Sequence, residues 1–272
     1  MEKTNIRRLI GVMMPFLIMV IVQRLGLLFL NRLPVSVFPG DLAAFLTASA
    51  AGIFFFRMSC GSELLRLRNL PPADTGEEYD PPVPPFPGRD TPFGIVMYIL
   101  VAAGALIAAM YAASTLIGGQ SSDLPDSRIL TAEFVSLVLI HPILEEYIFR
   151  WLYYRELRPM HPFFAGLAQA VMFAIVHGSV GGMICALFSG VILAVVLERS
   201  GSLSAAVIPH MLINLRSFVY LVWLTEAAQV RMMIDFGIVS LSFAAFLALL
   251  VRRGLRETWN SAAGKDKTDD RE

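Results

Sequence analysis

The chain has 272 residues, of which 56% are hydrophobic and 16% are charged, and its mean hydropathy is +0.64. A soluble protein would carry more charge, because about a quarter of the residues in soluble domains are Asp, Glu, Lys or Arg. The formal net charge is zero, which argues against a large basic surface and therefore against nucleic acid as a partner. The composition instead indicates a protein whose partner is the lipid bilayer.

Apolar runs follow one another along the chain, and each approaches the length of about 20 residues that a helix needs to cross a bilayer. They cover residues 9–30, 41–59, 93–117, 130–154, 163–179, 182–198, 203–224 and 234–251. The first run is too long for a signal peptide and lacks a small-residue cleavage site, so we expect a retained membrane anchor. The fold predicted is all-α, a polytopic membrane helix bundle of about eight transmembrane helices with its site in the bundle core.

Polar stretches divide the chain into parts. Residues 1–60 hold the N-terminal transmembrane helices, and residues 61–92 form a polar linker whose many prolines disfavour helix and favour an extended segment. Residues 93–254 form the main membrane bundle. Residues 255–272 have little apolar content to bury, so we expect a disordered tail.

Loop cations predict the orientation of the chain. With the N-terminus in the cytoplasm, Arg32, Arg128 and Arg231 are the loop cations left on the outside, and the others fall inside. This distribution satisfies the positive-inside rule, and an even number of spans then places both termini in the cytoplasm. The linker and the tail are cytoplasmic in this arrangement.

The fourth run contains Glu145, Glu146 and Arg150. Charged residues at the bilayer centre cost ~2.5–3.5 kcal/mol each on insertion scales, so they usually face the interior of a bundle. Glu146 and Arg150 are four residues apart and can pair on one helix face, which would be a structural role. Glu145 lies about 100° further round the helix and has no partner there. A buried carboxylate of this kind is a candidate general base.

Two later runs add further polar side chains. Phe173 and His177 end the fifth run, and His210 and Asn214 open the seventh, and in each pair the four-residue spacing puts both residues on one helix face. A single histidine or asparagine in a membrane helix often only hydrogen-bonds a neighbouring helix. If the three faces converge, however, these groups form a working set for hydrolysis.

Other polar residues in the runs have structural explanations as well. His141 lies one turn before Glu145 and is either its partner or a polar residue without a role. Pro142 is expected to kink the helix and to free a backbone carbonyl, because proline has no N–H. Gln23 and Arg24 interrupt the first run, which indicates a polar face turned toward other helices or side chains that reach the interface.

The ordered signatures Glu-Glu-x-x-x-Arg, Phe-x-x-x-His and His-x-x-x-Asn resemble those of the CPBP family (CAAX proteases and bacteriocin-processing enzymes, also described as ABI), which includes the type II CAAX prenyl endopeptidases. The resemblance covers about residues 130–224, and all three signatures are intact. It implies a glutamate-dependent intramembrane endopeptidase. The implied catalytic residues are Glu145, His177, His210 and Asn214, and the residues that support them are Glu146, Arg150, Phe173 and His141.

The chemistry of these residues suggests a mechanism. Glu145 takes a proton from water that His177 orients, while His210 and Asn214 donate hydrogen bonds to the oxyanion. One glutamate and two histidines can instead bind zinc, but zinc hydrolases usually need a base beyond three ligands. We therefore expect no cofactor, with zinc as the alternative.

The substrate implied by the resemblance is a membrane-anchored or lipid-modified protein or peptide. We expect the pocket at mid-depth and open toward the cytoplasm, in a multi-pass protein of a bacterial inner membrane. The alternative function is a non-catalytic membrane scaffold or a bacteriocin-immunity-type protein of the same fold. A proton-coupled transporter is a third possibility, but no halves of matching pattern support it.

Overall fold

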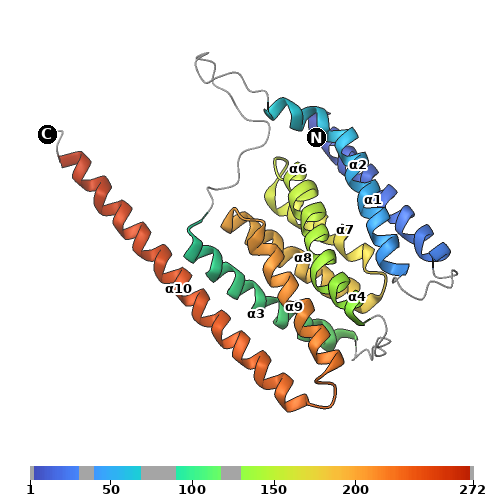
Figure 1. Ribbon diagram of the computed structural model, residues 1–272. Helices are drawn as coiled ribbons and strands as arrows, with labels where there is room; N and C mark the ends of the chain where they lie inside the picture. The colour runs from blue at the N-terminus through green and yellow to red at the C-terminus, as the bar shows by residue number, and fades with distance from the viewer. Residues whose placement is uncertain (1–2, 31–39, 69–89, 118–129, 270–272) are drawn as a thin grey trace.

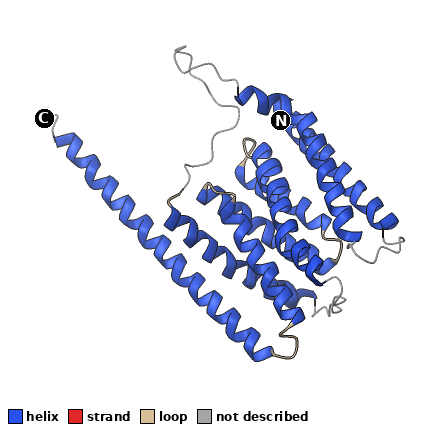
Figure 2. Ribbon diagram, viewed as in Figure 1, coloured by secondary structure: helices blue, strands red, loops and turns tan. Residues whose placement is uncertain are grey.

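The computed structural model describes residues 3–30, 40–68, 90–117 and 130–269. Every regular element in these residues is a helix, as Figure 1 and Figure 2 show. The elements are α1 (Lys3–Leu30), α2 (Gly40–Arg68), α3 (Pro92–Ile117), α4 (Leu130–Phe134), η1 (Val135–Ile140), α5 (His141–Glu145), η2 (Glu146–Tyr154), α6 (Arg155–Leu157), α7 (Pro162–Val176), α8 (Val180–Ser200), α9 (Ser204–Val222) and α10 (Ala228–Asp269). The predicted all-α class is confirmed.

The helices coincide with the predicted apolar runs. Within the described residues, six helices are long and apolar enough to cross a membrane: α1, α2, α3, α8, α9 and α10. The helix α7 is shorter, at 15 residues. The remaining run is the segment 130–157, in which α4, η1, α5, η2 and α6 follow one another without a break.

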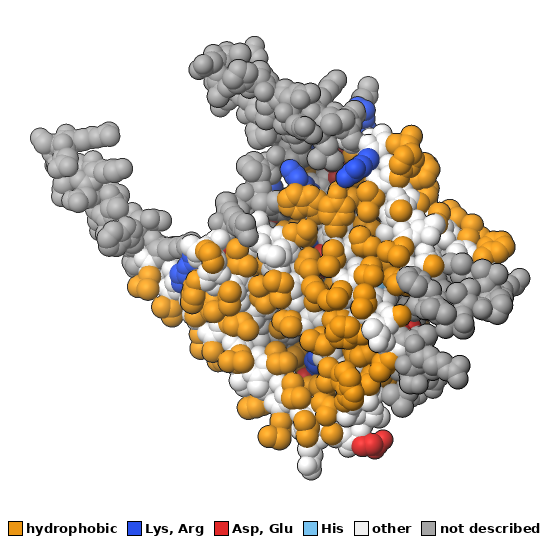
Figure 3. Space-filling view, in the orientation of Figure 1, with side chains coloured by type: hydrophobic (Ala, Val, Ile, Leu, Met, Phe, Trp, Pro, Cys, Tyr) orange, Lys and Arg blue, Asp and Glu red, His pale blue; other side chains and the backbone are white. Residues whose placement is uncertain are grey.

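Large apolar side chains cover much of the outer surface of the bundle (Figure 3). Phe163, Met233 and Phe236 are each about three-quarters exposed, at 74%, 74% and 76%. Apolar patches of this extent are rare on soluble monomers, and lipid is the environment that removes their contact with water. The protein is therefore an integral membrane protein.

The helices are arranged as a pair of helices beside a larger group. The helices α1 and α2 pack on each other at one side of the molecule, and α10 lies at the other side against α3 (Figure 1). The segment 130–157 lies between them and contacts α2, α7 and α9. Both termini lie at one end of the bundle (Figure 1), which we call the terminal face. We call the opposite end, where α9 ends and α10 begins, the distal face.

The segment 130–157 contains two π-helical stretches, η1 and η2. In a π-helix each N–H bonds to the carbonyl five residues earlier, and the N–H of His141 accordingly donates to the carbonyl of Ser136. The next bond in this pattern would join the N–H of residue 142 to the carbonyl of Leu137. Residue 142 is proline, which has no N–H. The carbonyl of Leu137 is therefore free of this bond, in line with our expectation that Pro142 frees a backbone carbonyl, and it can accept a donor from another helix.

Aromatic side chains fill the terminal half of the bundle between the α1–α2 pair and η2. The ring of Tyr153 lies between those of Phe16 and Phe56, with ring centroids 6.5 Å and 5.7 Å away. Nearer the terminal face, Arg8 of α1 pairs with Glu156 of α6 at 3.2 Å. These contacts anchor the N-terminal helix pair to the rest of the bundle.

Two predicted boundaries differ from the structure. The helix α2 continues to Arg68, so a linker cannot begin at residue 61, and residues 69–89 lie outside the described residues. The helix α10 continues to Asp269, so the tail that we predicted to be disordered from residue 255 is helical up to that point. The tail contains Arg, Glu, Ala and Lys, which favour helix, and extending an existing helix avoids the cost of nucleation.

Candidate active site

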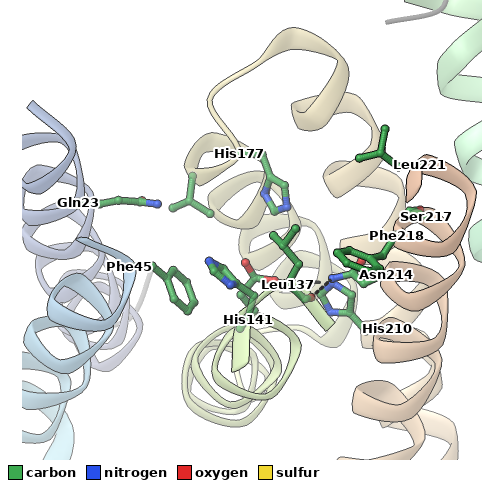
Figure 4. A pocket seen from close by; sticks show the side chains of 12 residues that line it. Gln23, Phe45, Leu137, His141, His177, His210, Asn214, Ser217, Phe218 and Leu221 are labelled. Carbon is green, nitrogen blue, oxygen red and sulfur yellow. Dashed lines mark hydrogen bonds and ion pairs between the residues drawn. The ribbon is translucent and has the colours of Figure 1, made fainter. Parts of the chain in front are cut away.

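A cavity of about 470 Å³ lies among the α1–α2 pair, the segment 130–157, the end of α7 and α9. All four side chains predicted to be catalytic line it and come from three different helices, and Figure 4 labels His177, His210 and Asn214 among them. They are Glu145, His177, His210 and Asn214. The other lining residues are Gln23, Phe45, Leu137, His141, Val176, Ser217, Phe218 and Leu221. The sequence thus predicted groups that lie together, while their catalytic roles stay predictions.

His210 lies between the two adjacent glutamates. Its Nδ1 is 2.9 Å from Oε1 of Glu146, and its Nε2 is 3.7 Å from Oε2 of Glu145. A carboxylate that is ion-paired, as Glu146 is with Arg150, only accepts hydrogen bonds, so we assign the proton to Nδ1. A neutral His210 then directs the lone pair of Nε2 toward Glu145.

Arg150 is fully buried beneath this pair of glutamates. Its Nη1 lies 3.1 Å from Oε1 of Glu146, as the four-residue spacing predicted, and its Cζ lies 4.4 Å from the centre of the Phe173 ring. The same ring contacts His177 and His210 edge to face, with centroid distances of 4.6 Å and 6.0 Å. Phe173 therefore connects all three sequence signatures, although only its spacing to His177 marked it.

His177 follows the last residue of α7 as its C-cap, and its side chain is exposed on the cavity side. Its Nδ1–H donates to the carbonyl of Phe173 at 2.8 Å, and because a carbonyl only accepts, Nε2 is the acceptor of the neutral ring. Gly178 follows with a φ of 75°, which favours glycine and turns the chain away from the helix. Arg24 of α1 donates to the carbonyl of Ile175 at 3.4 Å.

The side chain of Asn214 supplies the hydrogen-bond donor that the carbonyl of Leu137 lacks because residue 142 is proline. Its side-chain Nδ2–H donates to the carbonyl of Leu137 at 2.8 Å, which joins α9 to the segment 130–157. One N–H of Asn214 therefore has the structural role considered from the sequence, a hydrogen bond to a neighbouring helix. An amide nitrogen carries two hydrogens, so the second can serve a bound group.

Two walls of the cavity come from α1 and α2, outside the segment that carries the signatures. Phe45 of α2 stacks on the ring of His141, with centroids 3.9 Å apart and planes inclined by 22°. The Nδ1–H of His141 donates to the carbonyl of Ser136 at 2.9 Å. Gln23 of α1 also lines the cavity, and its polarity within an apolar run was a signal for an inward face. No pattern in the sequence indicated a role for Phe45, because aromatic residues are common in such runs.

Among the described residues, no three His, Cys, Asp or Glu side chains are grouped so that they could hold a metal ion. The arrangement therefore does not fit the zinc site that we considered from the sequence. We derive no step through a metal, and the expectation of a metal-free reaction stays a prediction.

A comparison with protein families finds a match to the central part of the chain. Residues 127–216 match the family model described as type II CAAX prenyl endopeptidase Rce1-like. This part of the chain is therefore similar to the Rce1-like family. The matched region contains all three signatures and is about a third of the chain, and it excludes α1, α2, α3 and α10. No curated protein and no solved structure matches the chain. The match supports a CAAX-protease-type intramembrane endopeptidase fold for this part of the chain.

Proposed function

We propose that the protein is an intramembrane endopeptidase that hydrolyses a peptide bond of a membrane-anchored or lipid-modified protein. The observation that carries the proposal is the single cavity lined by Glu145, His177, His210 and Asn214. A carboxylate, two imidazoles and an amide beside one cavity supply a base, a group that orients water and donors for an oxyanion. The family of residues 127–216 supports the same class of reaction.

In the proposed reaction, Glu145 accepts a proton from water while the water oxygen bonds to the scissile carbonyl carbon. Nε2 of His177 accepts a hydrogen bond from the same water and orients it. The carbonyl oxygen takes up the electron pair of the broken π bond and becomes an oxyanion. When the oxyanion collapses, the C–N bond breaks and Glu145 returns its proton to the leaving amine. One water is consumed, and the glutamate ends as it began.

The oxyanion is stabilised by Asn214 in this proposal, and also by His210 when its ring carries a second proton. The amide of Asn214 donates its second N–H, since the first is engaged by Leu137. His210 donates from Nε2 only when it carries a second proton, because Nδ1–H is directed at Glu146. One donor in a preorganised site is typically worth ~3–4 kcal/mol of transition-state stabilisation. Glu146 and Arg150 position His210 and contact no substrate.

The location follows from the same proposal. Arginines gather toward the terminal face, so the positive-inside rule puts both termini in the cytoplasm. They are Arg7, Arg8, Arg57, Arg155, Arg158, Arg199, Arg252 and Arg253. We place the protein in the inner membrane of a bacterium.

The test is a strain that carries Glu145→Gln, compared by membrane proteomics with one that carries Glu133→Gln. Both changes remove one carboxylate from the same helical segment, but Glu133 does not line the cavity. A peptidase predicts membrane peptides that stay uncut only in the Glu145→Gln strain, at an unchanged level of the protein. A scaffold or immunity protein would keep its effect in both strains, and that result would refute the proposal.

A further inference from the structure

The cavity extends from the middle of the bundle to the distal face. On α9, which begins at the terminal face, the lining residues are His210, Asn214, Ser217, Phe218 and Leu221. At a rise of ~1.5 Å per residue, His210 lies about 9 Å from the start of the helix and Leu221 about 26 Å from it. The last lining residue is thus one position before the distal end of α9, at Val222.

The other walls show the same direction. The segment 130–157 starts at the distal face, and its lining residues Leu137, His141 and Glu145 occupy successive turns from that end. Phe45 lies five residues after the start of α2, and Gln23 lies seven residues before the end of α1. Both positions are at the distal ends of their helices. No described residue from the terminal ends of these helices lines the cavity.

The exposure of the lining side chains changes along this direction. Glu145 and His210 are each only 7% exposed at the inner end of the cavity. Asn214, Ser217 and Leu221 are partly exposed, and Leu137 is 42% exposed. Toward the terminal face, in contrast, Phe149, Tyr153 and Leu157 are almost completely buried. Water and a peptide can therefore approach Glu145 from the distal side, whereas packed aromatic side chains lie on the terminal side.

We propose that the cavity opens on the distal face, so that the substrate is cut on the side of the membrane opposite both termini. This inference rests on the proposed peptidase function, and with cytoplasmic termini it makes the cleaved peptide extracytoplasmic. It reverses our expectation from the sequence, which was an opening toward the cytoplasm. The substrates are then membrane-anchored proteins with an extended segment just outside the bilayer. Apolar walls from Phe45, Val176, Phe218 and Leu221 favour an apolar side chain at the bond that is cut.

The test is cysteine labelling with a sulfonated maleimide that does not cross membranes. The full chain with Cys60→Ala and Cys185→Ala receives one new cysteine, either Ser217→Cys or Leu221→Cys at the proposed mouth. The matched control is His161→Cys, at an exposed position in the turn before α7 on the terminal face. Each variant is labelled in intact cells and in inverted membrane vesicles.

We expect the two mouth positions to react in intact cells, and residue 161 to react only in inverted vesicles. The proposal is overturned if the mouth positions react only in inverted vesicles, react from the same side as residue 161, or react from neither side. If the cysteine-free chain does not accumulate, the single changes are made in the unaltered chain, where the signal of Cys60 and Cys185 is subtracted. Labelling needs no turnover, so its result is independent of the Glu145→Gln experiment.

Discussion

Two of the charged clusters in the described part of the bundle differ in how completely their hydrogen bonds are made. The first, which we call the Asp235 cluster, consists of Asp235, Arg216, Tyr111 and Tyr220. Arg216 binds both carboxylate oxygens of Asp235, through Nε at 2.6 Å and Nη2 at 2.5 Å. The hydroxyls of Tyr111 and Tyr220 donate to the same carboxylate at 2.6 Å and 2.8 Å. The cluster joins α3, α9 and α10, and its geometry is that of a structural clasp.

The second, which we call the cavity cluster, consists of Glu145, Glu146, Arg150 and His210. Among the described residues, Oε2 of Glu146 and all three guanidinium nitrogens of Arg150 have no hydrogen-bond partner of good geometry. Glu145 has its nearest charged partner 3.7 Å away. Buried polar groups in native proteins usually have a hydrogen-bond partner, and a group without one needs an explanation such as a functional role. Burial of charge marks both clusters, but only this one leaves groups incompletely paired beside a cavity.

The largest expected effect is on the cleavage rate when Glu145 of the cavity cluster is changed, with little effect on stability. Glu145→Gln keeps the shape of the side chain and breaks no hydrogen bond shorter than 3.5 Å, so the thermal midpoint should change little. Loss of a general base should lower the cleavage rate by about 10²–10⁴-fold. Purified enzyme in lipid nanodiscs, assayed for cleavage and for thermal unfolding, gives both values. An active Glu145→Gln enzyme would remove this residue from the mechanism.

The Asp235 cluster should respond in the opposite way. Asp235→Asn leaves the Arg216 guanidinium without its carboxylate, and breaking a buried ion pair costs roughly 3–5 kcal/mol. The unfolding midpoint should fall, while the cleavage rate per folded molecule should stay the same, because neither residue lines the cavity. A variant that is stable but inactive would mean that the Asp235 cluster takes part in catalysis. The Asp235 cluster would then not differ in role from the cavity cluster.

Sequence reasoning was most reliable where one helix decides the outcome. The spacing of Glu146 and Arg150 predicted their ion pair, and Pro142 predicted a freed backbone carbonyl, which in the structure accepts from Asn214. Both follow from helical geometry within a few residues. The position of His210 between the two glutamates depends on the packing of α9 against a helix more than 60 residues earlier, so its spacing indicated a shared pocket but no particular partner.

The direction that we propose for the opening of the cavity could not be derived from the sequence, for a related reason. We counted depth along isolated runs, but α7 ends after 15 residues, which is shorter than a full membrane span, and His177 follows directly after it. The contribution of Phe45 depends on how α2 docks, which no local pattern encodes. The tail shows a different error, since low apolar content argues against a packed core but not against a helix that continues from the membrane.

A smaller effect is expected at Asn214, which takes part in both structure and proposed chemistry. Asn214→Ala removes an oxyanion donor, which should lower kcat by about 10²–10³-fold with little change in KM. It also leaves the carbonyl of Leu137 without its donor, at a stability cost of about 1 kcal/mol. Steady-state kinetics and thermal unfolding separate the two contributions. A loss of stability alone, with kcat intact, would reduce Asn214 to a link between helices.

The smallest expected effect is that of chelation on the cleavage rate. The two site histidines direct Nδ1–H at the carbonyl of Phe173 and at Glu146, and in the neutral rings each Nε2 then accepts a hydrogen bond from water or another donor. With Glu145 as the base, the proposed reaction needs only these protein groups, so incubation with a strong zinc chelator should leave the rate unchanged. A zinc peptidase treated in parallel controls for the chelator. Loss of cleavage that zinc restores would make Glu145 and the histidines metal ligands, and the cavity cluster would then differ from the Asp235 cluster by its metal rather than by its unpaired base.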